Sequence, residues 1–320
     1  MKNLGIALLL IAGACNSVPE KREETKIPVV AFLDLLQDET LAAAKKGFFM
    51  ALSDSGFREN NQTMQIIYRN AQGDQPTLLQ ACDYLLSQKP DLIATCPTLA
   101  TITAVKRTTE IPIFMTVSPR PDLAKLTNEF GRAPRNLFGT YETLEYIDTA
   151  VMLIRSLLPD AKKIGTIFNQ SEPQSLDAMN RIEKVCGMLG LQLEKLPVNN
   201  SNEAQLVVQA LLRKKIDAFF ALPDNTVFAG MEVIVKSCDD AKVPVFTSEE
   251  GLVKRGAVAA FGADMYQWGY QSGAQAATFL KTRSTEGLQP EAVLVRRKVF
   301  NALKAEKFKL TFDSTYVSVK

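Results

Sequence analysis

Polar side chains recur where short apolar runs end, and their types suit the binding of a small charged solute. In the second half of the chain these points carry Asn169 to Glu172, then Asp224 with Asn225, then Glu249 with Glu250. Carboxylates suit a ligand ammonium group. Hydroxyls and backbone N–H groups at a helix start suit a ligand carboxylate. Together they predict a site for a zwitterion such as an amino acid.

The first half offers Thr98 and Ser118 at equivalent points. Most of these residues also have a purely structural interpretation. Asp224 and Ser171 can serve as helix N-caps, and Asn169 as a turn residue. Glu249 and Glu250 are adjacent, so on extended backbone they point in opposite directions, and we expect at most one of them to face a ligand.

The chain lacks the residues that most enzymes use. It contains no histidine, which removes the commonest general base and the Ser-His-Asp and Cys-His mechanisms. It has no G-x-G-x-x-G, no P-loop and no G-x-S-x-G motif. None of the five cysteines forms a C-x-x-C pair, and we interpret Cys82, Cys96, Cys186 and Cys238 as isolated buried thiols. We therefore predict no catalytic residue, no metal and no cofactor.

The elements that position these residues alternate regularly along the chain. Short β-rich runs are separated by stretches with a 3.6-residue apolar period, a pattern that predicts parallel sheets covered by helices on both faces. The predicted strands are Ile27–Leu35, Met64–Arg69, Asp91–Cys96, Ile111–Val117, Lys163–Asn169, Gln192–Val198, Asp217–Leu222 and Val243–Thr247. The predicted helices are Glu39–Ser55, Thr77–Gln88, Thr98–Thr108, Leu144–Leu158, Pro173–Leu189, Glu203–Arg213 and Thr226–Asp239.

The two halves of the chain echo each other. Asp91–Thr98 and Asp217–Asp224 each open with Asp, continue as an apolar run and end in Pro followed by a polar residue. Ile111–Thr116 and Val243–Thr247 share a second pattern, with Pro in second place. Two matches in the same order predict two lobes of similar α/β topology. Ligands bind such sheets at the carboxyl ends of the strands, so we expect the site in the cleft between the lobes.

The first residues have the features of an export signal. Lys2 precedes the uncharged run from Leu4 to Ala14, and Cys15 follows small residues. We expect residues 1–14 to be a lipoprotein signal peptide, Cys15 to carry the lipid, and residues 15–26 to be a polar tether. The formal net charge of +2 gives no reason to expect a nucleic-acid partner.

Three separated motifs resemble one known family. They are Ile164–Ser175, Pro223–Thr226 and Glu249–Ala257, in that order. They resemble the ABC-transporter substrate-binding proteins typified by the tryptophan/tyrosine-binding lipoproteins of Gram-positive bacteria, and the resemblance runs from about Ile27 to Leu280. It implies a type I periplasmic-binding-protein fold, with two Rossmann-like lobes joined by a hinge of crossing strands. It also implies an ABC permease and an ATPase as partners, a monomeric state, and a place at the cell surface or in the periplasm.

The resemblance also implies lobe boundaries and contacts. It assigns 27–138 plus about 264–285 to lobe 1, and 139–263 plus about 286–320 to lobe 2. The implied ligand-binding residues are Asp38, Thr98, Ser118, Thr140, Asn169, Ser171, Glu172, Ser175, Asp224, Asn225, Glu250 and Asp264. We interpret Trp268 as a packing residue and the run Arg296 to Lys298 as a solvated face.

The sequence leaves other functions open besides the binding of an amino acid. The same fold can bind a sugar, a nucleoside or another polar solute. It can serve as a surface sensor that signals to a membrane kinase. An enzyme is the remaining class, for instance a hydrolase that uses two carboxylates such as Asp224 and Glu250.

Overall fold

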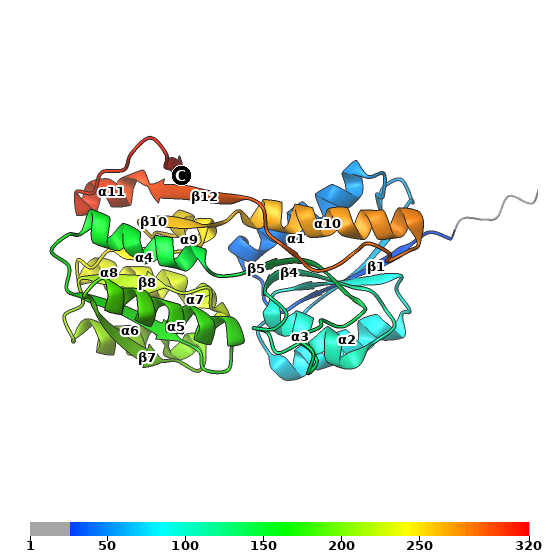
Figure 1. Cartoon of the computed structure of the whole chain (residues 1–320), viewed down its shortest axis with the longest axis horizontal. Coiled ribbons are helices and arrows are strands. Elements are labelled where there is room, and N and C mark those ends of the chain that lie inside the picture. The colour runs from blue at the N-terminus through cyan, green and yellow to red at the C-terminus, as the bar shows by residue number, and fades with distance from the viewer. Residues whose placement is uncertain (1–25, 320) are drawn as a thin grey trace, which may run out of the picture.

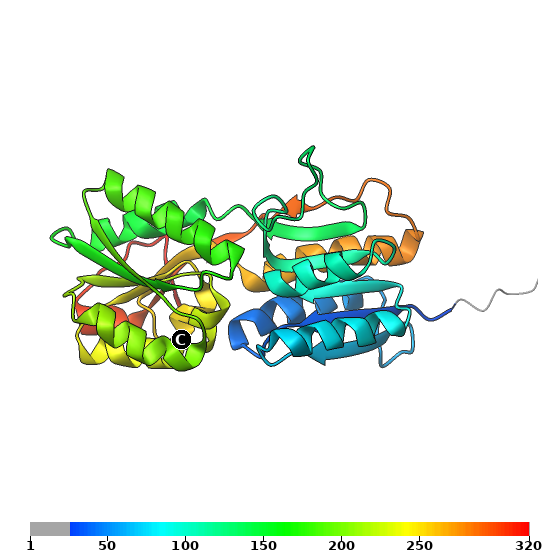
Figure 2. The same ribbon diagram turned by 90° about the horizontal axis from the view of Figure 1, so that it is seen from below.

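The computed structural model describes residues 26–319, which form two α/β lobes side by side (Figures 1 and 2). Each lobe is built on one mostly parallel sheet with helices on both faces. The predicted fold class is confirmed. The expected signal segment (1–14), Cys15 and the expected tether up to residue 25 lie outside the described residues.

The first lobe contains a six-stranded sheet of order β11-β5-β4-β3-β1-β2, in which all neighbours pair in parallel. Its strands are β1 (Val29–Asp34), β2 (Gln65–Asn70), β3 (Leu92–Cys96), β4 (Ile113–Pro119), β5 (Leu137–Glu142) and β11 (Glu291–Ala292). Helices α1 (Glu39–Asp54) and α10 (Met265–Thr282) cover one face, and α2 (Gln75–Ser87) and α3 (Thr98–Arg107) cover the other (Figure 1).

The second lobe contains a seven-stranded sheet of order β13-β12-β10-β9-β8-β6-β7, in which only β10 and β12 pair antiparallel. Its strands are β6 (Lys163–Phe168), β7 (Gln192–Pro197), β8 (Ala218–Ala221), β9 (Val245–Thr247), β10 (Ala259–Ala263), β12 (Arg296–Asn301) and β13 (Val317–Val319). Its helices are α4 (Tyr146–Leu157), α5 (Pro173–Met188), a 3-10 turn (Ser201–Glu203), α6 (Ala204–Leu212), α7 (Asn225–Ala229), α8 (Met231–Asp240), α9 (Glu250–Lys254) and α11 (Ala302–Phe308).

The predicted duplication is visible in both sheets. Strands β2-β1-β3-β4-β5 and β7-β6-β8-β9-β10 follow the same spatial order. The repeated Asp also has the same role in each lobe. Asp91 Oδ2 accepts the N–H of Val29 at 2.7 Å, and Asp217 Oδ2 accepts the N–H of Lys163 at 2.8 Å. Each Asp therefore ties the start of its lobe's third strand to the start of the first.

Three segments cross between the lobes: β5 to α4, β10 to α10, and β11 to β12. Strand β5 spans 137–142 inside the first sheet, so the boundary predicted between 138 and 139 falls within a strand. Strand β11 also joins the first sheet, so the segment 286–320, which the sequence predicts for lobe 2, is divided between the two sheets. Periodicity in the sequence marks a strand but does not say which of two sheets it joins.

Helices α1 and α10 approach closely because glycines line their contact. A Cβ at Gly269 would lie 1.8 Å from the carbonyl oxygen of Ala44, and one at Gly47 would lie 2.0 Å from that of Tyr266. No side chain fits at such distances. This contact holds α10, with Met265 and Trp268 near its start, rigidly against α1.

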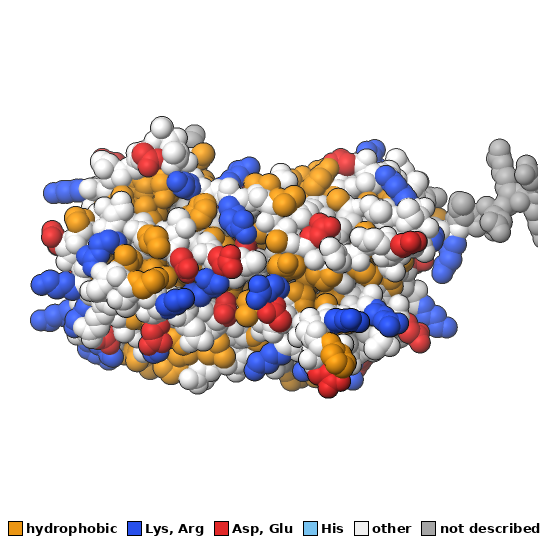
Figure 3. All heavy atoms as spheres, viewed as in Figure 1, with side chains coloured by type: hydrophobic (Ala, Val, Ile, Leu, Met, Phe, Trp, Pro, Cys, Tyr) orange, Lys and Arg blue, Asp and Glu red, His pale blue; other side chains and the backbone are white. Residues whose placement is uncertain are grey.

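The four described cysteines, Cys82, Cys96, Cys186 and Cys238, are buried and unpaired, in agreement with their interpretation as isolated thiols. Among residues 26–319, no helix combines the length and apolar character that a membrane crossing requires. Figure 3 shows positive and negative side chains interspersed on the face that it presents.

Candidate functional site

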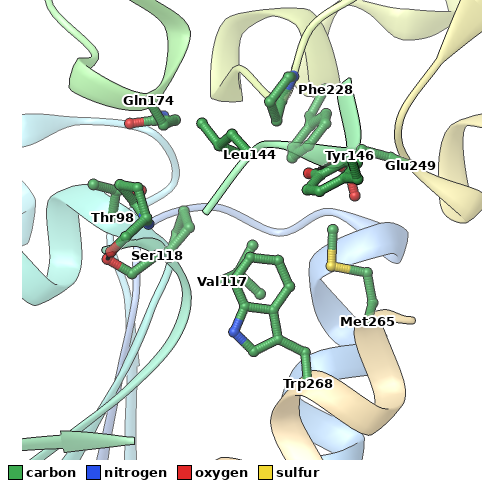
Figure 4. A pocket seen from close by; sticks show the side chains of 13 residues that line it. Thr98, Val117, Ser118, Leu144, Tyr146, Gln174, Phe228, Glu249, Met265 and Trp268 are labelled. Atoms are coloured by element: carbon green, nitrogen blue, oxygen red, sulfur yellow. Dashed lines mark hydrogen bonds between the residues drawn. The ribbon is translucent and has the colours of Figure 1, made fainter. Parts of the chain in front are cut away.

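A narrow pocket lies between the lobes, and we call it the aromatic cavity (Figure 4). Strand ends and helix starts of both lobes build its wall. The first lobe contributes Pro97, Thr98, Val117, Ser118, Pro119, Met265 and Trp268, and the segment after β5 with the second lobe contributes Leu144, Tyr146, Gln174, Pro223, Phe228 and Glu249. The site lies where the switch-point rule for parallel sheets places it.

Most of this wall is apolar and aromatic. Figure 4 shows Trp268 and Phe228 on opposite sides of the cavity, with Met265 and Leu144 beside them. The indole Nε1–H of Trp268 donates to the carbonyl oxygen of Thr140 at 2.8 Å, which fixes the orientation of the ring. A pocket of this kind suits a large apolar or aromatic group.

One end of the cavity presents hydrogen-bond donors from the first lobe. Thr98 opens helix α3, whose first turn has no side-chain cap, whereas Asp38 and Asp224 cap α1 and α7. The Ser118 hydroxyl donates only a long 3.3 Å bond, to the carbonyl of Pro119. Uncapped N–H groups with a neighbouring hydroxyl form a site suited to a carboxylate.

Two cavity residues have a left-handed backbone that side chains rarely adopt. Val117 has a φ of 49° and Leu144 a φ of 62°, and both line the aromatic cavity. Such strain is costly for a β-branched residue and concentrates at functional sites. At Val117 the pairing register between β4 and β5 also shifts, which turns the end of β4 toward the cleft.

Glu249 supplies a carboxyl group from the second lobe. Its side chain is buried, and its Oε1 accepts the hydroxyls of Tyr146 at 3.0 Å and Ser248 at 3.1 Å. Its Oε2 has no hydrogen-bond partner among the described residues. Burial raises the pKa of the Glu249 carboxyl to about 8, because removal from water disfavours its charged form.

Gly262 of β10 positions the loop that carries Glu249. A Cβ at this position would lie 1.7 Å from the carbonyl oxygen of Ser248. The strand therefore packs directly against the backbone of the loop, and a side chain at this position would displace the loop.

A second, wider and more polar pocket adjoins the first, and we call it the polar cavity. It has many amide side chains and one buried carboxylate. It is lined by Leu35, Leu36, Gln37, Gln72, Gly73, Gln75, Leu99, Asn169, Ser171, Glu172, Asn199, Asn200, Ser201, Asn225, Thr226 and Ala229. Glu172 Oε2 accepts the backbone and side-chain N–H groups of Asn225 at 3.0 and 2.8 Å, as well as the amide of Gln174. Gln174 lines the aromatic cavity, so this bond joins the two cavities.

The structure divides the predicted contact residues among several places. Thr98 and Ser118 line the aromatic cavity, and Asn169, Ser171, Glu172 and Asn225 line the polar cavity. Glu250 and Asp264 lie instead in a groove between α1, α9 and α10, which we call the outer groove. The predicted residues that line none of these are Asp38, Thr140, Ser175 and Asp224.

Three of these four residues, Asp38, Ser175 and Asp224, use their side-chain oxygens within the protein. Asp38 caps α1 and pairs with Arg255 of the other lobe. Asp224 caps α7 and accepts the hydroxyl of Ser175 at 2.5 Å. Thr140 is buried in β5, and its hydroxyl has no hydrogen-bond partner among the described residues. The role of these four residues as direct ligand contacts stays a prediction, and the internal bonds of Asp38, Ser175 and Asp224 give these three a structural role in addition.

Sequence reasoning missed several residues of the aromatic cavity. It chose Glu250 over Glu249, and it interpreted Trp268 as packing only, although Trp268 both packs and lines the cavity. Tyr146, Gln174 and Phe228 carried no signal apart from ordinary helix patterns. The interpretation of Arg296 as solvated was also wrong, since Arg296 binds the buried Glu142.

The family model described as ABC transporter substrate binding protein matches residues 26–318. The chain belongs to this family. The family resemblance noted in the sequence is therefore confirmed. A tyrosine-binding protein of Clostridioides difficile is 30% identical over 293 residues, which cover 90% of this chain and 84% of the relative.

Solved structures share the fold. A conserved domain protein of Vibrio cholerae is 27% identical with a TM-score of 0.85, covering 92% of this chain and all of the other. An ABC domain of Streptococcus pneumoniae in complex with L-Trp has a TM-score of 0.82 at 23% identity, covering 90% and 96%. A ligand-free, open substrate-binding protein of Clostridium difficile, 26% identical, has a TM-score of 0.68 and covers 92% and 100%.

Proposed function

We propose that this substrate-binding protein serves an ABC importer and that its ligand is an amino acid with an aromatic side chain, held in the aromatic cavity. One observation carries the proposal. The cavity combines an aromatic wall, carboxylate-binding donors at the start of α3, and the carboxyl group of Glu249. A free aromatic amino acid presents the three complementary groups.

The arrangement couples binding to closure of the lobes. Thr98, Ser118 and Trp268 belong to the first lobe, and Tyr146, Phe228 and Glu249 to the second. A ligand that contacts both sets has a higher affinity for the closed form and shifts the population toward it. The permease and ATPase partners then recognise the closed lobes.

The relatives support this ligand class without assigning it to this chain. The Clostridioides difficile relative is named a tyrosine-binding protein, and the Streptococcus pneumoniae domain was solved with L-Trp. Both names concern aromatic amino acids, which the wall formed by Trp268 and Phe228 suits.

A thermal-shift screen tests the proposal. Residues 16–320 are unfolded and refolded to remove any ligand carried from the host, then heated with L-tryptophan, L-tyrosine, L-phenylalanine, L-leucine, ribose or a nucleoside. Ligand at about a thousand times its dissociation constant stabilises the native state by roughly 4 kcal/mol, which raises the melting temperature by several degrees. A shift with aromatic amino acids alone supports the proposal, and none with any amino acid refutes it.

The polar cavity favours a second candidate function. Its amide side chains suit a hydroxylated solute such as a sugar or a nucleoside. In the same screen, a shift with ribose or the nucleoside but none with amino acids supports this alternative. Asn225→Ala, in the polar cavity, then weakens binding more than Phe228→Ala, in the aromatic cavity.

We also propose that Cys15 carries a lipid that anchors the protein at the outer side of a membrane. The apolar run before Cys15 and its small-residue ending support this. In a bacterial host, the full chain should fractionate with membranes, and Cys15→Ala should release it to the soluble extracytoplasmic fraction. Equal distribution of the two forms would refute the anchor.

A further inference from the structure

We propose that Glu249 selects ligands that carry an ammonium group, and that binding of this ammonium releases a proton from the Glu249 carboxyl group to solvent. The inference rests on the proposed function, since it names how that same cavity recognises one end of the amino acid.

The geometry singles out Glu249 among the buried carboxyl groups of the cleft. Its side chain is 1% exposed and reaches the wall of the aromatic cavity, and its Oε2 has no partner in the described part of the chain. An orphaned carboxylate oxygen at such a depth is uncommon and calls for a donor. Figure 4 shows Glu249 beside Tyr146, across the cavity from Thr98 and Ser118.

Asp34 also has an oxygen without a partner among the described residues, but its other oxygen pairs with Lys45. Two further buried carboxyl groups, Glu172 and Asp224, differ from Glu249 in having both oxygens supplied or their main acceptor satisfied by the protein. Glu172 accepts amide hydrogen bonds from Asn225 and Gln174. Asp224 caps α7 and accepts the N–H of Asn169 and the hydroxyl of Ser175. Both are therefore supplied with donors by the protein itself, whereas Glu249 keeps one oxygen for a ligand.

No basic side chain among residues 26–319 neutralises Glu249. The titratable groups that face it are Tyr146 of α4 and Glu142 of β5. Arg296 of β12 pairs instead with Glu142: its Nη2 donates to Oε1 at 2.7 Å and its Nε donates to Oε2 at 3.1 Å. Tyr146 and Ser248 lower the pKa of Glu249 by donating hydrogen bonds, but burial outweighs them and Glu142 adds repulsion. The carboxyl group is thus mostly protonated at neutral pH.

The proton balance of binding follows. A ligand ammonium enters as R–NH₃⁺, the Glu249 O–H bond breaks, the proton leaves to solvent, and an ammonium–carboxylate pair remains. Opposite charge within a few ångströms favours the ionised carboxylate, so the pKa of Glu249 falls when ligand binds. With a starting pKa of about 8, close to one proton should leave per ligand at pH 7.

The sign of the pH dependence is then determined. Because the ligand prefers ionised Glu249, apparent affinity should rise with pH by about tenfold per unit while Glu249 is protonated. The rise should flatten as pH passes the free pKa of about 8. An amine ligand bound through a permanently ionised carboxylate would show no such rise.

Isothermal titration of the refolded protein with L-tryptophan, L-tyrosine and L-phenylalanine tests the proposal. Titrations in phosphate and in Tris at pH 7 should give binding enthalpies that differ by the difference between the ionisation enthalpies of the two buffers, multiplied by about one proton. The number of protons released, and with it the enthalpy difference, should fall to about half at pH 8, where free Glu249 is half ionised. Indole-3-propionate, which lacks the ammonium group, should bind at least tenfold more weakly than L-tryptophan and release no proton.

Glu249→Gln should remove the proton release and weaken amino-acid binding at least tenfold, while Glu250→Gln in the outer groove should change neither. Binding of an aromatic amino acid without proton release would overturn the inference and leave the proposed function standing, and this measurement needs no variant. Absence of binding by all three aromatic amino acids would instead refute the proposed function.

Discussion

Arg255 of the second lobe reaches Asp38 of the first, with Nη1 2.5 Å from Oδ2. The two side chains are 13% and 4% exposed. Nη2 of Arg255 also donates to the carbonyl oxygen of Phe228 at 2.7 Å, and its guanidinium pairs with Glu232. One arginine therefore links the lobes to each other and to a residue of the aromatic cavity, and we infer that this pair stabilises the closed form.

Asp38→Asn should open the lobes without unfolding either of them. Asn keeps an oxygen to cap α1 but loses the charge that Arg255 binds, which removes about 1–2 kcal/mol from the closed form. We expect ligand affinity to fall about tenfold, measured by titration calorimetry, and the unliganded protein to expand in X-ray scattering. Asp74→Asn is the matched control, because Asp74 caps α2 in the same way but pairs with no basic residue. Equal effects of the two variants would argue against an interlobe role for Asp38.

Ser118→Ala should weaken amino-acid binding and leave stability unchanged. The Ser118 hydroxyl has only one long bond within the protein, so its donor is available to a ligand carboxylate. Loss of one hydrogen bond to a charged group costs about 1.5 kcal/mol, or about tenfold in affinity. Ser237→Ala, in the exposed part of α8, should bind ligand as the parent does. An unchanged affinity in Ser118→Ala would show that the ligand carboxylate does not bind at Ser118.

Arg296→Ala should destabilise the protein at the crossing between the lobes. It leaves Glu142, whose side chain is fully buried, without its cation. An uncompensated buried charge costs about 3 kcal/mol or more, measured as the free energy of unfolding in urea. Arg107→Ala removes an exposed pair with Asp83 and should cost less than about 1 kcal/mol. Similar losses in both variants would contradict this account of the crossing.

Gly269→Ala should be destabilising, whereas Gly187→Ala should be stabilising. At Gly269 the new methyl group meets the backbone of Ala44, so α1 and α10 must separate at a cost of about 2 kcal/mol or more. At Gly187, near the end of α5, nothing lies within 4 Å, and alanine adds helix propensity worth about 0.5–1 kcal/mol. Opposite shifts in melting temperature check both expectations, and the same sign for the two would disprove the packing argument.

Much of the architecture was predictable because its signals are local. Apolar periodicity and the position of Pro marked most strands and helices, and the Asp91 and Asp217 motifs marked the repeat. Those signals depend on a few neighbouring residues, whose backbone preferences and burial are expressed wherever the segment lies. The sequence also placed the site at the strand ends, where Thr98 and Ser118 do line the aromatic cavity.

What only the tertiary structure decided is which side chains meet across the cleft. The sequence by itself determined that at most one of Glu249 and Glu250 points inward, and only the fold shows that Glu249 lines the aromatic cavity while Glu250 lies in the outer groove. The sequence did not distinguish Trp268 and Phe228 from core residues, because the wall of an apolar cavity and the core of a lobe use the same buried aromatic side chains and give the same sequence pattern. Asp38 and Arg255 are far apart along the chain, and only the docking of two lobes brings their charges together, since electrostatic pairing depends on distance in space and leaves no local pattern.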